Sequence, residues 1–555
     1  MGLVPSLNPF SPVFTVPIDK VLYVPLLYLA FPPENLIVPL LAKNVTHNSN
    51  YTKWTINLLP NLKWDNGQPL TSTDVAFTVK DYYFGTGIIP KSGLISVTNL
   101  NSTATVVTFN TSESQFEYEL ASVGGSYPGI LPYSTYAKLS PANLTTFTNF
   151  NNIVASGPFV IYNYSEGTNP IIFTANEYYY RGPPKMSQMY LHLFSSYTSE
   201  DSAYVSDALD AIWESSSYSD LKPILNVSGY TLHSIVPAAI KVIMLNTFSY
   251  PFNLTGFRQA LAYATNRSEI NNVVNSQTLP LANYDILTSA YNNQIGLNNS
   301  SLLTYSYSLE KVNATMTSLG FKRVNNVWSF SNGKTIVLNI TYNAASTDSY
   351  DTAQLLSTMW TSAGFKVTLN GIASSTEDSL ILGETGWSIV VMTSYTIGPL
   401  PGPLSNLITP GPPMQFYVNN TTVWWNSSYY QDIINASKYP VLSSSANYYT
   451  RLATSIVQNS VPIIPLFYLS NWVGVSNQFY WGSPSNNTGI FNTQAMIQEQ
   501  FWYGSLWAVH PITTISKIHT NTLYLYLILV IIVVGAIAAG AAMVITRKRR
   551  HRNKI

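Results

Sequence analysis

Hydrophobic and polar residues alternate along residues 53–59, in the order Lys-Trp-Thr-Ile-Asn-Leu-Leu. A period of two predicts a strand with one buried face. Asp65-Asn66-Gly67 follows and predicts a tight turn, because glycine readily adopts the backbone conformation that such turns need. Thr71 and Asp74 then have the spacing of a capping box ahead of an apolar run, which predicts the start of a helix. This stretch therefore predicts a strand, a turn and a helix in succession.

Longer patterns of the same two kinds continue through the rest of the chain. Apolar residues at helical spacing predict helices over 257–273 and 350–363, and the strand-like run 336–340 lies between them. Helical and strand-like segments that alternate in this way are typical of α/β proteins.

The chain ends with a long apolar run, residues 523–545, that contains no charged residue. As a helix it would be ~34 Å long, enough to cross a hydrocarbon core of ~30 Å. Basic residues crowd the tail 546–555 directly after it. Because such clusters stay on the cytoplasmic side, we expect a single-pass membrane protein with a cytoplasmic tail and an extracellular ectodomain. Residues 510–522 would be a short linker to the membrane.

The amino-acid composition excludes several classes of function. The net charge is +1 and only 10% of residues are charged, so no basic surface for nucleic acid is expected. The chain has no cysteine, which excludes disulfides, thiolate metal sites and cysteine nucleophiles. Sequons for N-glycosylation are dense and favour an exported glycoprotein, of a kind that would suit an archaeal surface. They include Asn44, Asn50, Asn101, Asn110, Asn143, Asn163, Asn226, Asn253, Asn313, Asn339, Asn426, Asn435 and Asn486.

The first residues, Met1 to Pro5, have neither a basic segment nor the apolar core of a signal peptide. Since a large ectodomain needs an export signal, we expect one to be encoded upstream of this start.

The segment Leu62–Phe77 carries a more specific signal. Its sequence, Leu-Lys-Trp-Asp-Asn-Gly-Gln-Pro-Leu-Thr-Ser-Thr-Asp-Val-Ala-Phe, resembles a signature of extracellular solute-binding proteins of the oligopeptide-binding type (family 5), which serve ABC importers. Further matches in the family's order are Leu7–Phe10, Ser156–Val160, Asn176–Tyr179, Ala208–Ile212, Pro251–Arg267, Ser362–Val367 and Val461–Leu466. We expect Gly67, Pro69 and Arg258 to maintain the fold, with Arg258 as a buried, paired guanidinium.

The resemblance implies a periplasmic-binding-protein-like α/β fold, with two lobes joined by a two-segment hinge and an extra inserted domain. Lobe I would comprise 1–40, 151–237 and 463–509. The inserted domain would be 41–150 and lobe II 238–462.

No enzyme motif is present: the chain has no G-x-S-x-G, HExxH or P-loop sequence, and its histidines lack the spacing of metal ligands. We therefore expect no enzymatic activity, cofactor or metal. A receptor of this family would bind a small-molecule ligand between its lobes and deliver it to a permease with a separate ATPase. Three groups of residues are candidates for ligand binding. Trp213, Glu214 and Ser215 follow a predicted strand at 210–212, and we expect them to enter the cleft as a loop. The resemblance places Trp387, Tyr395 and Thr396 in a segment near the ligand, and Trp424 and Trp502 are further aromatic candidates.

The ligand class is less constrained. Peptide-binding members of the family have an acid that pairs with the peptide's ammonium, and Tyr395 stands in its place here. No carboxylate lies between Trp387 and Gln431. A buried ammonium without a counter-charge is costly, so the sequence leaves both oligopeptides, ranked first by the resemblance, and oligosaccharides open. A surface hydrolase and a surface-layer protein are the distant alternatives.

Overall fold

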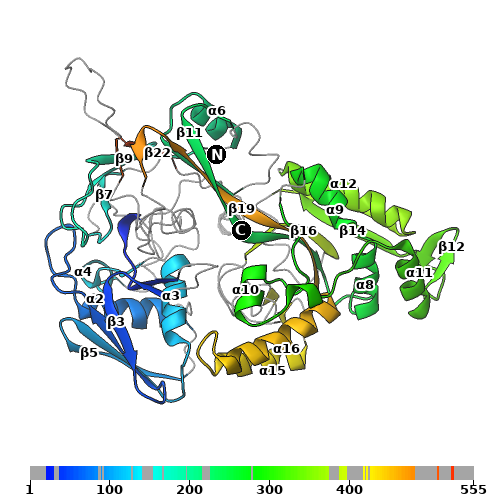
Figure 1. Ribbon diagram of the computed structural model, residues 1–555, viewed down its shortest axis with the longest axis horizontal. Helices are drawn as coiled ribbons and strands as arrows, with labels where there is room; N and C mark the ends of the chain where they lie inside the picture. The colour runs from blue at the N-terminus through cyan, green and yellow to red at the C-terminus, as the bar shows by residue number, and fades with distance from the viewer. Residues whose placement is uncertain are drawn as a thin grey trace, which may run out of the picture. The chain divides into compact units, whose positions relative to one another are not determined.

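The structure is a computed structural model. It describes residues 21–29, 37–85, 89, 93–126, 129–139, 154–164, 168–194, 197–215, 226–276, 279–344, 346–373, 387–396, 417–418, 421–422, 426–481, 509–511 and 527–530. The chain divides into two compact units (Figure 1). Unit 1 comprises 1–214, 223–235 and 471–535, and unit 2 comprises 215–222, 236–470 and 536–555. The division of unit 1 into a lobe and an inserted domain stays a prediction.

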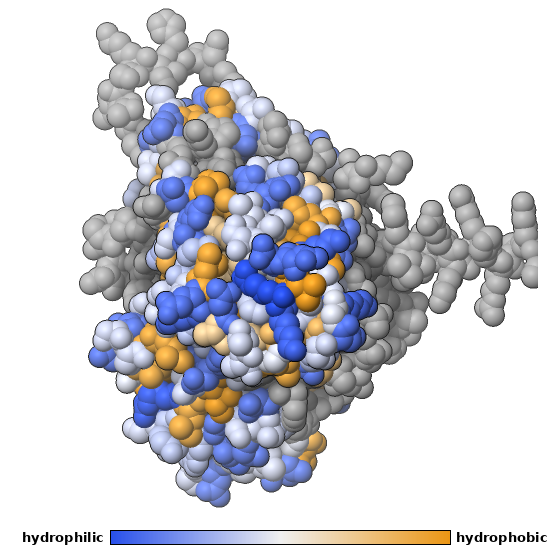
Figure 2. Space-filling model, turned by 90° about the vertical axis from the view of Figure 1, so that its right-hand side faces the viewer, coloured by the Kyte–Doolittle hydropathy of each residue, from blue (hydrophilic) through white to orange (hydrophobic). Residues whose placement is uncertain are grey.

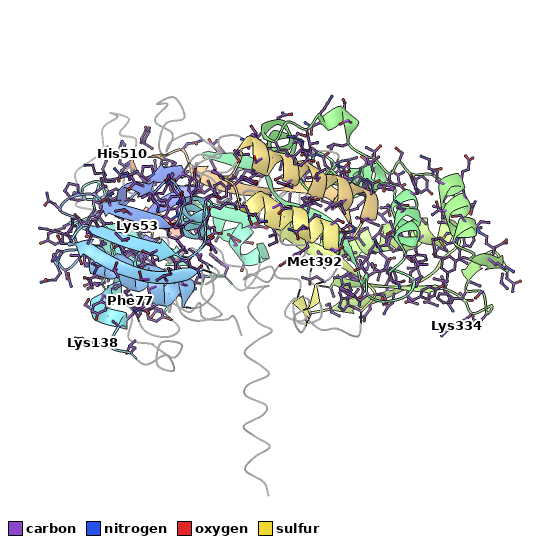
Figure 3. All side chains as sticks on the ribbon, turned by 90° about the horizontal axis from the view of Figure 1, so that it is seen from below. Lys53, Phe77, Lys138, Lys334, Met392 and His510 are labelled. Atoms are coloured by element: carbon purple, nitrogen blue, oxygen red, sulfur yellow. The ribbon has the colours of Figure 1, made fainter. Side chains whose placement is uncertain are left out.

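Unit 1 contains an antiparallel sheet of four strands in the order β3-β4-β6-β5. The strands are β3 (Ala42–His47), β4 (Lys53–Leu58), β5 (Leu94–Asn101) and β6 (Ala104–Phe109). The alternation predicted at 53–59 is confirmed, because Trp54, Ile56 and Leu58 of β4 are buried and the residues between them are not. Lys53 at the start of this strand is labelled in Figure 3.

The turn and capping box after β4 are confirmed. Gly67 has a φ of +80°, which few residues other than glycine adopt easily. Helix α2 (Ser72–Phe77) is capped by Thr71, whose side chain accepts from the Thr73 amide. Asp74 in turn accepts from the Thr71 amide at 2.8 Å. A π-helix, η1 (Thr78–Phe84), continues α2. Helices α3 (Phe116–Ser126) and α4 (Tyr133–Tyr136) complete this part of the unit.

A second sheet of unit 1 has the order β22-β9-β8-β7. Its strands are β7 (Phe159–Asn163), β8 (Ile171–Ala175), β9 (Gln188–His192) and β22 (Leu527–Val530). Helix α6 (Tyr197–Val205) and strand β10 (Ala211–Ser215) follow β9 along the chain. Two small pairs are β1 (Leu27–Leu29) with β2 (Ile37–Pro39), and β20 (Phe479–Tyr480) with β21 (His510–Pro511).

Strand β22 falls inside the run 523–545, for which a membrane helix is predicted. Over Leu527–Val530 the structure has a strand parallel to β9, so the helical prediction is wrong for these four residues. A run of Leu, Ile and Val suits an extended strand as well as an apolar helix, and length alone favoured the helix. The rest of the run lies outside the described residues. None of the helices that the structure describes is both long and apolar enough to span a bilayer.

Unit 2 is built on a mixed sheet with the strand order β10-β19-β11-β16-β14-β15, whose first strands also enter unit 1. The strands are β11 (Tyr230–Leu245), β14 (Val337–Asn343), β15 (Lys366–Ile372), β16 (Ile389–Thr396) and β19 (Ile463–Ser476). Strand β14 runs parallel to both β15 and β16, whereas β11 runs antiparallel to β16. The predicted strand at 336–340 is thus confirmed as β14.

Helices cover both faces of this sheet (Figure 1). One core cluster gathers residues of α8 (Thr255–Tyr263), α9 (Arg267–Asn275), α11 (Leu309–Ser318) and α12 (Thr347–Ser362) against the sheet. The other contains residues of α10 (Ser289–Gln294), α15 (Ser427–Ser437) and α16 (Ser444–Ser460). Figures 1 and 3 show α15 and α16 side by side. The smaller elements of unit 2 are η3 (Asn299–Ser301), β12 (Lys322–Val324), β13 (Val327–Ser329), β17 (Tyr417–Val418) and β18 (Thr421–Thr422).

The predicted helix at 350–363 is confirmed as α12, which begins slightly earlier, at Thr347. The predicted helix 257–273 is wrong as a single helix, because α8 ends at Tyr263 and α9 begins at Arg267. Asn266 starts the second helix by accepting from the Glu269 amide. A periodic apolar pattern that continues across both helices concealed this break.

Arg258 on α8 is buried, as predicted, at 3% exposure. Within the described part of the chain, its hydrogen-bond partners are carbonyls and a hydroxyl, not carboxylates. The guanidinium donates to the carbonyls of Ser460, Val461 and Phe252, and to the Thr255 hydroxyl. Burial lowers the pKa of Arg258 to about 10. Arg258 therefore joins α8 to the end of α16, which is a structural role.

Candidate functional site: two strands that pass between the units

Strands β11 and β19 are the two long strands in which the chain passes from one unit to the other. In β11 the division falls between Ile235 and Val236, and in β19 between Ser470 and Asn471. The two strands are neighbours in the sheet. We call them the hinge strands, because two adjacent extended segments are a connection that can bend without unfolding either unit.

On the side of unit 1, hydrogen bonds hold the ends of both hinge strands. The Tyr230 hydroxyl lies 2.6 Å from both Asp207 Oδ1 and the Leu209 carbonyl. The Thr231 hydroxyl donates to Asn477 Oδ1 at 2.7 Å and so joins β11 to the end of β19. Burial and the Asp207 carboxylate raise the pKa of Tyr230. The phenol therefore stays protonated and can keep donating.

Gly474 lets β19 pass close to α6 and β10 in unit 1. A Cβ atom there would lie 2.4 Å from the Tyr204 hydroxyl oxygen and 2.7 Å from Ile212 Cγ2. Both distances are shorter than a nonbonded contact allows, so a larger residue would push the hinge strand away from its neighbours.

On the side of unit 2, Tyr468 holds β19 just before the division. Its side chain is buried, and its hydroxyl donates to the Leu287 carbonyl at 2.6 Å. The same oxygen accepts from the Asn283 amide at 3.2 Å. Burial raises the pKa of Tyr468, so this hydroxyl also stays protonated.

Lys241 occupies the corresponding place on β11, shortly after the chain has entered unit 2. Its side chain is fully buried, and the ammonium donates to Asp348 Oδ2 at 3.1 Å and to the Ser349 hydroxyl at 2.7 Å. Asp348 and Ser349 lie in the first turn of α12, behind the N-cap Ser346. A carboxylate in this position also interacts favourably with the helix dipole.

The carboxyl ends of β14 and β16 lie at the same edge of the sheet, because the two strands are parallel. Helix α12 follows β14, so its N-terminus lies at that edge as well. In open α/β sheets, ligands bind outside the carboxyl ends of the strands. This edge is therefore the candidate ligand-binding side of unit 2.

The predicted residues Tyr395 and Thr396 end strand β16 at this edge. They pair with Ile240 and Ala239 of β11, so the structure places them beside Lys241 in the hinge strand. Their side chains lie outside the described residues.

The surroundings of Trp387 are not those of the ligand contact that was predicted for it. Its side chain is only 6% exposed and belongs to the core cluster with α15 and α16. Its carbonyl accepts from the Asn246 amide at 3.2 Å. This arrangement favours packing over ligand contact.

Trp213, Glu214 and Ser215 end strand β10, close to where the chain leaves unit 1. The prediction that they form a loop is wrong, because the strand continues through Ser215. Their side chains lie outside the described residues. Trp424 and Trp502 lie wholly outside the described residues.

Lys241 and Tyr468 were missed by the sequence reasoning. A single lysine in an apolar strand carries a weak signal, and nothing in the local pattern points to Asp348. Within the described ranges, no cluster of three His, Asp or Glu side chains is placed to hold a metal ion. On the face shown in Figure 2, apolar side chains form separate patches between polar ones.

Comparison with solved structures defines the class of fold. The chain is similar to an oligopeptide-binding protein of Bacillus subtilis in complex with a nonapeptide (TM-score 0.70, 16% identity, 91% of this chain and 98% of that one). It is also similar to a mannohexaose-bound periplasmic oligopeptide-binding protein of Thermotoga maritima (TM-score 0.73, 18% identity, 92% of this chain and 97% of that one). The fold is that of the periplasmic binding proteins.

The family follows from sequence. The profile of the bacterial extracellular solute-binding proteins, family 5 (Middle) matches residues 37–411, and the chain belongs to this family. A curated relative, the nickel-binding periplasmic protein of Escherichia coli, is 22% identical over 297 residues. That match covers 50% of this chain and 54% of the relative, so the chain matches about half of the relative's length.

Proposed function

We propose that this protein is the solute-binding receptor of an ABC importer. It captures a solute from outside the cell by bending at the hinge strands and passes it to a permease that a separate ATPase drives. The main support is that the two long strands in which the chain crosses between the units, β11 and β19, are adjacent and are held by hydrogen bonds on both sides of the division. Such a connection permits closure around a ligand that contacts both units.

For the ligand, we rank an oligopeptide first. Membership of family 5 supports this ranking, and so does the similarity to a protein that was solved with a nonapeptide. An extended ligand of this kind could hydrogen-bond to strand ends such as that of β16.

An oligosaccharide is the second candidate, and three observations favour it. No carboxylate lies between Trp387 and Gln431 to receive a peptide ammonium. Asp348, an acid at the candidate edge, is already paired with Lys241. The Thermotoga maritima protein binds mannohexaose within the same fold.

The anchor remains part of the proposal. Residues 523–545 would cross the membrane as a helix, with the basic tail inside the cell and the two units outside. Leu527–Val530 would then have to leave the edge of β9. Protease treatment of intact cells should remove the units and spare the tail, whereas complete protection of both units would place them in the cytosol.

Thermal unfolding of the purified full-length chain tests the ligand class. Nonapeptides and mannohexaose are added separately, and a ligand at 100 times its Kd should add about 2.7 kcal/mol to the stability of the binding unit. A shift with peptides alone supports the first ranking, and a shift with mannohexaose alone supports the second. Recovery of shortened peptide or sugar would instead indicate a hydrolase.

A further inference from the structure

The Lys241–Asp348 ion pair is embedded in a small polar network. Asp348 Oδ2 accepts from the Lys241 ammonium. Asp348 Oδ1 accepts from the hydroxyls of Ser346 and Ser349, and Ser349 also accepts from Lys241. Every member belongs to unit 2, and the network joins β11 to the first turn of α12.

Lys241 also lies at an irregularity of the sheet. Ile240 pairs with Tyr395 and Val242 with Met392, so one residue of β11 stands opposite two residues of β16. A bulge of this kind interrupts the ladder and twists the strands locally. Met392, at one end of the bulge, is labelled in Figure 3. The position is one where the register of β11 could slip.

A buried ion pair is a poor way to gain stability. Removing two charges from water costs about as much as their attraction returns, and well-packed apolar residues often serve equally well. The pair instead supplies geometric specificity, because a charge-assisted hydrogen bond holds its donor and acceptor in one arrangement. Apolar contacts in the surrounding core do not fix register in this way.

We propose that Lys241 and Asp348 are positioning residues that anchor hinge strand β11. They hold its register at the bulge and confine bending to the residues before Ile240. They also fix the position of β11, beside which strand β16 ends with Tyr395 and Thr396. The role in bending rests on the proposed receptor function, whereas the anchoring of β11 can be measured without any ligand.

The test is amide hydrogen exchange of the ligand-free, full-length chain. In the double variant K241M/D348L the charges are replaced by apolar side chains of similar size. We expect its urea midpoint to stay at or above that of the parent protein, while the amides of Ile240–Ile243 exchange at least tenfold faster. Amides in α8 and α9 should keep their parent rates.

K366M is the matched control, since Lys366 is an exposed residue of β15 in the same sheet. K366M should change neither the urea midpoint nor the exchange rates of the Ile240–Ile243 amides. If K241M/D348L unfolds too early to analyse, S349A removes the 2.7 Å hydrogen bond from Lys241 and the weaker bond from Ser349 to Asp348 Oδ1, and leaves both charges in place. It should speed the exchange of the same amides about threefold. Parent exchange rates in the double variant, or in S349A where the double variant does not fold, would overturn the proposal. Failure to bind any solute would affect the receptor function alone.

Discussion

Asp285 makes the stability of unit 2 depend on pH in a direction that can be worked out. Its side chain is fully buried in the segment between α9 and α10, and the Leu287 amide donates to Oδ1 at 3.1 Å. Burial raises the pKa of Asp285 from the ordinary value of 3.8 to about 6, although hydrogen bonds from Leu287 and Asn292 offset part of the effect. The folded protein therefore holds this proton more tightly than the unfolded chain.

Proton linkage gives the direction in which the free energy of unfolding changes with pH. Below pH 3.8 the acid is protonated in both states, and its contribution to stability is fully present. Between pH 3.8 and about 6 only the unfolded chain has lost the proton, so the free energy of unfolding falls as the pH rises. The two pKa values differ by an amount that corresponds to about 3 kcal/mol.

Urea unfolding, followed by the fluorescence of the buried tryptophans of unit 2, measures this contribution. Asp285→Asn is nearly isosteric and carries no titrating proton. Burial also raises the pKa of Asp65 and Asp74, but these acids are present in both proteins. From about pH 3 to about pH 7, the parent should lose about 3 kcal/mol relative to the variant. A difference between the two proteins that does not change with pH would refute the reasoning.

Three further predictions concern single side chains. Gly474→Ala should lower the free energy of unfolding, measured in urea, by about 1–3 kcal/mol, because the new Cβ would lie 2.4 Å from the Tyr204 hydroxyl; an unchanged free energy would show that β19 can shift at no cost. Tyr468→Phe should cost about 1–2 kcal/mol by thermal unfolding, since the Leu287 carbonyl and Asn283 amide each lose a partner, and parent stability would contradict this. Thr71→Ala removes the cap of α2 and should cost about 1 kcal/mol, whereas Thr71→Ser should restore most of it.

Features that depend on neighbouring residues were predictable from the sequence. The strand at 53–58, the turn at Gly67 and the cap at Thr71 follow from patterns only a few residues long. Their physical causes, period-two burial and a side chain that reaches the next turn, are equally local. The α/β class followed because many such segments alternate.

Features that depend on tertiary contact were not predictable in this way. Lys241 and Asp348 are 107 residues apart, and only the folding of β11 against α12 brings them together. Trp387 is a large aromatic residue of the kind that can contact a ligand, yet just before β16 begins it packs in the core cluster with residues of α15 and α16. The apolar run at the C-terminus suits both a strand and a helix, so hydropathy could not specify the four residues of β22.

The most direct test of the account measures whether the two units close on a solute. The chain contains no cysteine, so K53C/K334C introduces the only two thiols, one in each unit, at the exposed positions labelled in Figure 3. Single-molecule energy transfer between dyes at these positions follows their separation with and without nonapeptide or mannohexaose. We predict that a solute which binds shifts the population to a shorter and narrower distribution. A solute that binds tightly and leaves the distribution unchanged would contradict the receptor mechanism.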